Sequence, residues 1–173
     1  GIEIFRTIEK KLGKMSITAE DLGFITPEVR QLVEDTGFPS MKVLQFAFDG
    51  NAKNEYLPHN YKTSNCVVYT GTHDNDTLKG WVSTSPKSTI KYCLEYMKLR
   101  FRSEIAWGVI RLAWSSCAEI AIVQMQDLLN EGSKSRMNTP STLKNNWTYR
   151  IRQNDLNKNL VHKLQKLNRI YDR

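Results

Sequence analysis

The stretch Met41-Lys42-Val43-Leu44-Gln45-Phe46-Ala47-Phe48, followed by Asp49-Gly50, shows the pattern that decides the fold. Its largely apolar residues predict a buried strand, and the Asp-Gly pair predicts the turn that ends it. Three further runs repeat this order of apolar and then polar residues: Ser16–Ala19 before Glu20-Asp21-Leu22-Gly23, Cys66–Thr70 before Gly71-Thr72-His73-Asp74, and Ala118–Met125 before Gln126-Asp127. The sequence therefore predicts four strands, each followed by polar or acidic side chains.

Helical periodicity predicts helices between these strands. Residues 3–13 place apolar side chains on one helical face. Thr26 and Pro27 are a typical N-cap and first residue for a second helix, which ends at Gly37. Further helical stretches are expected at 90–97, 103–116 and 156–171. Asp76 is a candidate cap for the segment that follows it, and the alternation of helix and strand favours a parallel α/β sheet.

Polar residues at the ends of parallel strands are typical of a TIM barrel, in which the chemistry collects at the C-terminal ends of the strands. A complete barrel has eight strands and about 250 residues, whereas this chain has 173 residues and about four strand-helix units. We predict an α/β fold, the C-terminal half of a TIM (β/α)8 barrel, with residues 1–173 forming a single domain fragment. A doubly wound sheet is the alternative, but no glycine-rich phosphate fingerprint follows any of the strands.

The composition is that of a soluble globular protein, with 40% hydrophobic and 25% charged residues. No apolar run approaches the roughly 20 residues that a membrane helix needs. Residues 1–14 lack the apolar centre of a signal peptide. We therefore expect no membrane partner and a cytoplasmic location, or a plastid if the source is a plant or an alga.

The net charge of +7 gathers near the C-terminus, where residues 144–173 hold eight basic and two acidic side chains. Five apolar side chains recur there at helical spacing: Leu156, Leu160, Leu164, Leu167 and Tyr171. The basic residues are therefore expected to form the solvated face of a docked amphipathic helix. Nucleic-acid binding by this stripe is the alternative, and a steep salt dependence of duplex binding would support it. The prediction is that nucleic acid is not a partner.

The cysteines are Cys66, Cys93 and Cys117, an odd number at wide spacing. This pattern matches neither a disulfide framework nor a zinc site. Free cysteine packs as a small hydrophobic residue, so all three are expected to be buried and reduced.

Several ordered blocks of the sequence carry a resemblance to a known family. These blocks are Ala19–Gly23, Ile25–Val29, Met41–Phe48, Tyr56–Tyr61, Val68–Thr77, Gly80-Trp81, Arg136–Pro140 and Asn146-Trp147. Together they resemble the 4-alpha-glucanotransferases, also called amylomaltases or disproportionating enzymes. The resemblance runs from about Gly1 to Tyr149.

The resemblance implies a TIM barrel, as in the alpha-amylases, with three catalytic carboxylates after the fourth, fifth and seventh strands. Glu20 looks like the general acid/base after the fifth strand, and Asp74 like the transition-state stabiliser after the seventh. In the family the nucleophilic aspartate ends an Arg-x-Asp segment, and no such triplet occurs among these residues. The nucleophile is therefore expected upstream of Gly1, and the fragment alone is expected to be inactive. No cofactor is implied.

The resemblance also implies substrate contacts for four residues: His73, Asp49, Asp21 and Asn146. The first three also have plainer interpretations. Asp49 before Gly50 is also a common turn pair, and Asp21 could serve mainly as a charge beside Glu20. An acidic pair after a strand is, without the family context, often a helix cap or a surface pair. The run from His73 to Asp76 offers only a partial set of metal ligands, so no metal site is predicted.

Four positions depart from the family pattern. Ser40, Ser141 and Asn145 stand where glycine is usual, and Tyr149 stands where tryptophan is common. If those glycines adopt positive φ, serine would be strained there, whereas asparagine tolerates this conformation better. The shape of the loop between residues 132 and 147 is the feature most affected.

The activity that the resemblance implies is retaining transfer of alpha-1,4-glucan segments to the 4-hydroxyl of another glucan or glucose. The expected partners are alpha-1,4-glucans and maltooligosaccharides. Two alternatives are a glucan-binding or vestigial half-barrel without catalysis and a related alpha-glucan hydrolase. Half a barrel leaves open strand edges and an uncovered apolar face, so the isolated chain is expected to self-associate.

Overall fold

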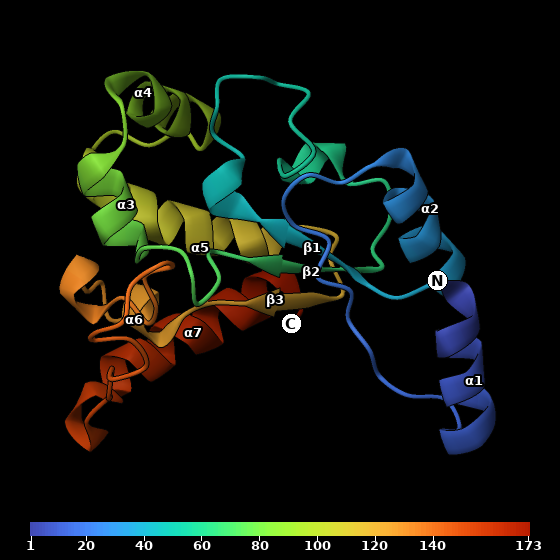
Figure 1. Ribbon diagram of the computed structural model, residues 1–173. Helices are drawn as coiled ribbons and strands as arrows, with labels where there is room; N and C mark the ends of the chain where they lie inside the picture. Colours follow the sequence, from blue (N-terminus) through green and yellow to red (C-terminus); the bar gives the residue numbers. More distant parts are fainter.

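A parallel sheet of three short strands lies at the centre of the computed structural model, which describes residues 1–173 (Figure 1). The strands are β1 (Ser40–Val43), β2 (Cys66–Tyr69) and β3 (Ile120–Ile122), in that order across the sheet. In the ladder Met41 and Ile120 both lie opposite Val67. The predicted parallel α/β arrangement is confirmed.

Seven α-helices accompany the sheet. They are α1 (Ile2–Leu12), α2 (Pro27–Thr36), α3 (Leu78–Thr84), α4 (Lys87–Tyr96), α5 (Ile105–Ser115), α6 (Met125–Leu128) and α7 (Lys158–Tyr171). Helix α2 has the predicted ends, because the Thr26 hydroxyl accepts from Val29 N and Gly37 adopts φ 67°. Helix α3 is capped by Thr77, whose hydroxyl accepts from Gly80 N, so the prediction of Asp76 as the cap was wrong.

The two faces of the sheet have different surroundings. Alternate residues of a strand point to opposite faces, and Cys66 and Val68 on one face join the main hydrophobic cluster with residues of α4 and α5. Figure 1 shows α3, α5 and α7 on this covered side. On the other face, here called the inner face, Ile120 and Ile122 of β3 are 49% and 42% exposed. The chain therefore covers one side of its sheet and leaves part of the other open.

The predicted strand Ser16–Ala19 does not form, so the sheet has three strands where four were expected. Ala19 N donates to Pro39 O at 2.9 Å, as in a parallel ladder. The next bond of such a ladder would run from Met41 N to the Ala19 carbonyl. Instead, Met41 N donates to the side chain of Asp21 at 2.7 Å. A side-chain acceptor has replaced the backbone acceptor, and the ladder stops there.

Two other predicted strands are shorter than expected. The apolar run at 41–48 leaves the sheet after Val43 and continues as a 3₁₀ turn, Leu44–Phe46. Leu44, Ala47 and Phe48 are nevertheless almost fully buried in the main cluster. The strand predicted at 118–125 is reduced to Ile120–Ile122. An apolar run in the sequence indicates that the segment is buried, but burial alone does not distinguish a strand from a packed turn.

Helix α1 forms as predicted, but the rest of the chain does not cover its apolar face. No residue of α1 is buried, and Ile4 and Leu12 are 62% and 70% exposed. Its main contact is with α2 and the adjoining loop, where the Phe5 and Phe38 rings meet edge to face at 5.2 Å. Figure 1 accordingly shows α1 away from the sheet.

The basic C-terminal segment docks as the amphipathic helix α7. Leu160 and Leu167 are buried, and the Lys163 ammonium lies over the Trp107 ring of α5, 3.1 Å from its centroid. Cys66 and Cys93 are buried as predicted, whereas Cys117 is exposed, because it lies in the turn between α5 and β3. None of the helices combines the length and apolar character needed to span a bilayer.

Candidate active site

A cavity of about 620 Å³ lies on the inner face, beyond the C-terminal ends of the strands. Its lining includes Glu20 and Asp74, the two predicted catalytic carboxylates, together with His73. Tyr69 also lines it, and burial together with the charge of Glu20 raises the pKa of this tyrosine. The structure thus brings together acidic side chains that are more than fifty positions apart in the sequence.

The loop after β2, residues 71–76, is held by glutamines that follow the two neighbouring strands. Gln124 Nε2 donates to Thr72 O, and Gln45 Nε2 donates to Asp76 O, each at 2.8 Å. A Cβ atom at Gly71 would lie 2.5 Å from Gln45 Nε2, so any other residue there would have to displace the end of the Gln45 side chain from its bond to Asp76 O. Neither glutamine is predicted from the sequence to be functional, although both are polar residues at or near strand ends. Their contacts fix the segment that carries His73 and Asp74.

Residues from the irregular segment 132–147 determine the surroundings of Asp74. Asn138 Nδ2 donates to Asp74 Oδ1 at 2.6 Å, and His73 Nε2 lies 3.3 Å from the same oxygen. The Arg136 guanidinium donates to the Asp74 carbonyl. The Trp147 ring lies 5.1 Å from the His73 ring at an interplanar angle of 34°. The carboxylate is therefore oriented by neighbours on two separate segments.

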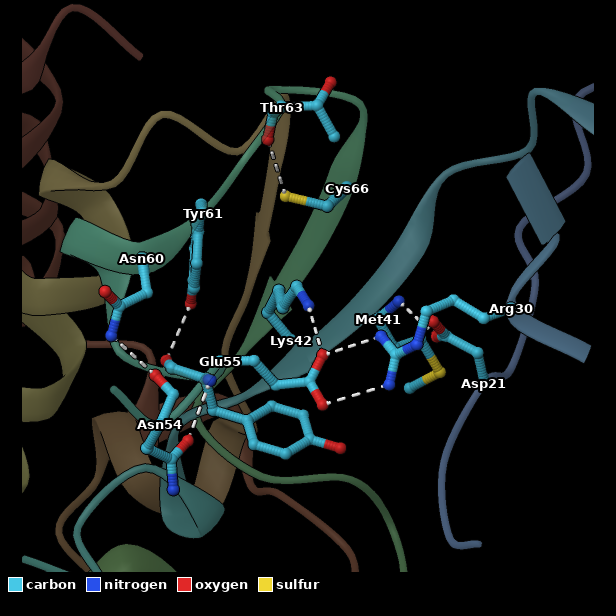
Figure 2. Close-up of polar contacts among 11 residues, drawn as sticks. Asp21, Arg30, Met41, Lys42, Asn54, Glu55, Asn60, Tyr61, Thr63 and Cys66 are labelled. Carbon is cyan, nitrogen blue, oxygen red and sulfur yellow. Dashed lines mark hydrogen bonds and ion pairs between the residues drawn. The ribbon is translucent and has the colours of Figure 1, made fainter. Parts of the chain in front are cut away.

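Asp21 lies apart from Glu20, although the two are adjacent in the sequence. Its side chain lines a second cavity of about 240 Å³ with Arg30, Lys42 and Glu55. Figure 2 shows this group, in which Arg30 donates to both Glu55 oxygens at 3.1 and 3.4 Å and Lys42 lies 3.4 Å from one of them. Hydrogen bonding from Arg30 lowers the pKa of Glu55 against the opposing effect of burial.

Asp49 and Asn146, the other predicted substrate contacts, do not line the cavity of Glu20 and Asp74. Asp49 is exposed, and its carboxylate accepts from Asn51 N at 2.8 Å, which is the turn role considered as its alternative. Asn146 braces its own loop, because its amide accepts from Thr139 N at 2.9 Å and donates to Thr142 O at 3.0 Å.

Comparison with known proteins identifies the family to which the chain belongs. The family model described as 4-alpha-glucanotransferase matches residues 1–156. The chain belongs to the 4-alpha-glucanotransferase family. It is 48% identical over 173 residues to the 4-alpha-glucanotransferase of Clostridium butyricum, covering 99% of this chain and 35% of that protein. It is 48% identical over 151 residues to the chloroplastic/amyloplastic 4-alpha-glucanotransferase DPE1 of Arabidopsis thaliana, covering 87% of this chain and 26% of that protein.

A solved structure establishes the fold of this 4-alpha-glucanotransferase segment. The chain superposes on the amylomaltase of Streptococcus agalactiae, solved in complex with acarbose, with a TM-score of 0.93 and 38% identity. The match covers 99% of this chain and 35% of that one. The fold is a partial TIM barrel, as predicted, and the chain spans about a third of the length of the relatives it matches.

Two departures from the glucanotransferase glycine pattern fall at left-handed backbone positions. Ser141 and Asn145 adopt φ of 63° and 62°, a conformation that costs a serine roughly 1–2 kcal/mol and an asparagine less. Ser40 lies in β1 instead and carries no such strain. The serine is accommodated in an exposed loop whose hydrogen bonds run through Asn146.

A buried carboxylate, Asp127, lies behind the site and is not predicted from the sequence to have a role. It is 1% exposed. Its oxygens accept from the Thr70 hydroxyl at 2.8 Å and from Leu78 N at 2.6 Å, which joins the two ends of the 71–76 loop. Burial raises the pKa of Asp127 to about 6, although both hydrogen bonds act in the opposite direction.

We expect the Asp127→Asn variant to lose a pH dependence that the parent chain shows. A raised folded-state pKa means that the group's contribution to stability is complete below its ordinary value of 3.8 and is lost as the pH rises through about 6. Between pH 4 and 7 the variant should therefore gain about 2 kcal/mol in unfolding free energy relative to the parent, since part of the effect is already present at pH 4. Urea unfolding at both pH values measures this. Glu9→Gln, at an exposed carboxylate, is the control and should show the same pH dependence as the parent. If the unfolding free energies of Asp127→Asn and of the parent changed equally between pH 4 and 7, the expectation would be contradicted.

Proposed function

We propose that this chain forms the part of a 4-alpha-glucanotransferase that carries its acid/base and its stabilising carboxylate. The observation that carries the proposal is that Glu20 and Asp74 line one cavity at the C-terminal ends of the strands. The reaction is retaining transfer of an alpha-1,4-glucan segment to the 4-hydroxyl of another glucan or of glucose. Alpha-1,4-glucans and maltooligosaccharides are the proposed partners.

Glu20 supplies the proton in this mechanism. In the first step its carboxylic acid protonates the leaving glycosidic oxygen, while a second carboxylate, roughly 5–5.5 Å away, attacks the anomeric carbon. In the second step the Glu20 carboxylate takes a proton from the acceptor's 4-hydroxyl. The attacking carboxylate is proposed to lie in the part of the whole protein that precedes Gly1, so the isolated chain is expected to be inactive. No step requires a cofactor.

Asp74 stabilises the positive charge that develops on the sugar. Its carboxylate is fixed by Asn138 and His73 at 2.6 and 3.3 Å, so it needs little reorganisation as the charge forms. His73 is proposed to share the sugar hydroxyls with Asp74, with Trp147 stacked against its ring. Substrate contacts for Asp49, Asp21 and Asn146 remain predictions. These three residues lie outside the cavity of Glu20 and Asp74, so they would have to contact other parts of the glucan.

The proposal is tested by inserting this chain into a complete enzyme. Its residues replace the matching 35% of the Clostridium butyricum 4-alpha-glucanotransferase, and products from maltotriose are separated by chromatography. Glucose together with longer maltooligosaccharides is the expected result. Hydrolysis products alone would favour the hydrolase alternative. A folded chimera that binds maltooligosaccharide without turning it over would favour the non-catalytic alternative.

The cellular location of the protein is a further prediction. A cytoplasmic enzyme is expected, or a plastid enzyme in a plant or alga. The names of the relatives from Arabidopsis thaliana and Solanum tuberosum include the word chloroplastic, which describes those proteins. Fractionation of the source cells with an antibody to this chain tests the prediction.

We expect the isolated chain to self-associate through its inner face and open strand edges. β1 and β3 each pair only with β2, and Ile120 and Ile122 are 49% and 42% exposed. Light scattering over a range of concentrations should give a mass that rises with concentration. The double variant Ile120→Thr/Ile122→Thr should weaken this rise, whereas Ile170→Thr, at a residue of α7 that is 57% exposed, should not. A monomer at all concentrations with a sharp unfolding transition would contradict the expectation.

A further inference from the structure

Two of the three cysteines meet at one carbonyl group. Cys66 Sγ lies 3.6 Å and Cys117 Sγ 3.8 Å from the carbonyl oxygen of Thr63. Figure 2 shows the Cys66 sulfur directed at this oxygen. Cys66 begins β2, so the pair lies at the opposite end of the sheet from the candidate active site.

Backbone contacts hold the segments that carry these thiols. Glu119 N donates to Ser64 O at 2.9 Å, which joins the two segments just before the ladder between β2 and β3 begins. The Arg173 guanidinium donates to the carbonyl groups on either side of Cys117, at 2.8 and 2.7 Å. The turn with Cys117 is therefore tied both to the start of β2 and to the end of the chain.

The two thiols differ in accessibility and the third is remote from them. Cys117 is exposed, whereas Cys66 is 1% exposed and burial raises its pKa to about 11. Proximity of the two thiols is also a cause of this increase. Cys93 lies fully buried on α4. An exposed thiol beside a buried one is an arrangement in which the first reacts with a reagent and the second resolves the product.

We propose that Cys66 and Cys117 form a reversible intramolecular disulfide in response to a small-molecule disulfide such as oxidised glutathione. The Cys117 thiolate attacks one sulfur of the reagent, forms a mixed disulfide and releases one glutathione thiolate. The deprotonated Cys66 then attacks the Cys117 sulfur and displaces the second. Two protein thiols are oxidised to one disulfide, and oxidised glutathione is reduced to two thiols that take up the two protons.

Both sulfurs already lie beside the Thr63 carbonyl oxygen, at 3.6 and 3.8 Å. Each thiol gives up only a weak hydrogen bond to Thr63 when it turns toward the other. The bond would join residues that are 51 positions apart, and so would close a long loop in the unfolded chain. The unfolding temperature of the oxidised form should therefore rise by on the order of 5–10 °C. No contact of Glu20 or Asp74 changes, so the proposal stands independently of the proposed function.

The test is to incubate the folded, reduced chain with oxidised glutathione and to map its disulfides by mass spectrometry. We expect a peptide that links Cys66 to Cys117, with the loss of two hydrogens, and its reversal by dithiothreitol. Cys117→Ser and Cys66→Ser should each abolish the link, and Cys93→Ser should leave it intact. The same incubation in urea is the control for geometry, because the two shorter loops that include Cys93, Cys93–Cys117 and Cys66–Cys93, should then be favoured over Cys66–Cys117.

Three results would overturn the proposal. The first is glutathione retained on Cys117 with Cys66 free. The second is an intermolecular Cys117 disulfide as the main product. The third is a link from Cys93 to either Cys66 or Cys117 as the main product in the folded chain. Circular dichroism before and after oxidation verifies that the chain remains folded.

Discussion

The Glu20→Gln variant of the chimeric enzyme is expected to transfer glucan from maltotriose about 10²–10⁴-fold more slowly than the unmutated chimera. Glutamine has nearly the same shape as glutamate but cannot give a proton to the glycosidic oxygen or take one from the acceptor. Because the side chain lies in an open cavity without a hydrogen-bond partner on the chain, the substitution should leave the fold unchanged. Initial rates at saturating maltotriose measure the loss.

A donor whose leaving group needs no proton separates the acid role from a structural one. Fluoride departs from an alpha-maltosyl fluoride without general acid help, so the first step should be largely retained in the Glu20→Gln variant. Glu34→Gln, at an exposed carboxylate of α2, is the matched control and should be fully active. Because Glu20 also acts in the second step, the comparison uses the rate of the first step, followed with the fluoride as the initial burst of fluoride release. Equal losses in this rate with both donors, or no loss with either, would contradict the assignment of Glu20.

The Asp74→Asn variant of the chimera is expected to lose about 10²–10³-fold in turnover, a typical effect of removing one preorganised stabilising group. Asparagine can still accept the hydrogen bond from Asn138 through its amide oxygen, so the position of the side chain is kept while the negative charge is lost. The loss should appear in kcat with both maltotriose and the fluoride, because the charge acts on the sugar and not on the leaving group.

A variant of Asn138, the hydrogen-bond partner of Asp74, separates the loss of the carboxylate charge from the loss of its orientation. Asn138→Ala removes the partner that orients Asp74 but leaves the carboxylate in place. It should therefore cost less than Asp74→Asn. If Asp74→Asn retained a tenth or more of the activity, or if Asn138→Ala were the more damaging change, Asp74 would not be the stabilising carboxylate.

The sequence predicts the order and type of most elements because their signals are local. The apolar runs at β1, β2 and β3 and the caps of α2 depend on neighbouring residues only. The loss of the strand at Ser16–Ala19 could not be predicted in this way. It depends on the Asp21 carboxylate reaching Met41 N, a contact between segments that only the folded chain brings together.

The same distinction applies to the candidate site. Glu20 and Asp74 were selected because motif blocks with a family resemblance surround them. Gln45, Gln124 and Asn138, which hold the 71–76 loop and Asp74, were not selected. Their roles arise from packing across three segments, and a polar residue near a strand end gives only a weak signal. Asp21 and Glu20 are adjacent in the sequence but line different cavities, a separation that adjacency in the sequence cannot predict.

The central claim is that Glu20 and Asp74 act on one sugar unit. A crystal structure of the chimera with acarbose, the compound present in the Streptococcus agalactiae amylomaltase structure, tests it most directly. The account predicts that Glu20 and Asp74 both lie within hydrogen-bond distance of acarbose, on the same ring or across the bond that joins two rings. Acarbose bound in the cavity with either carboxylate out of contact would contradict it.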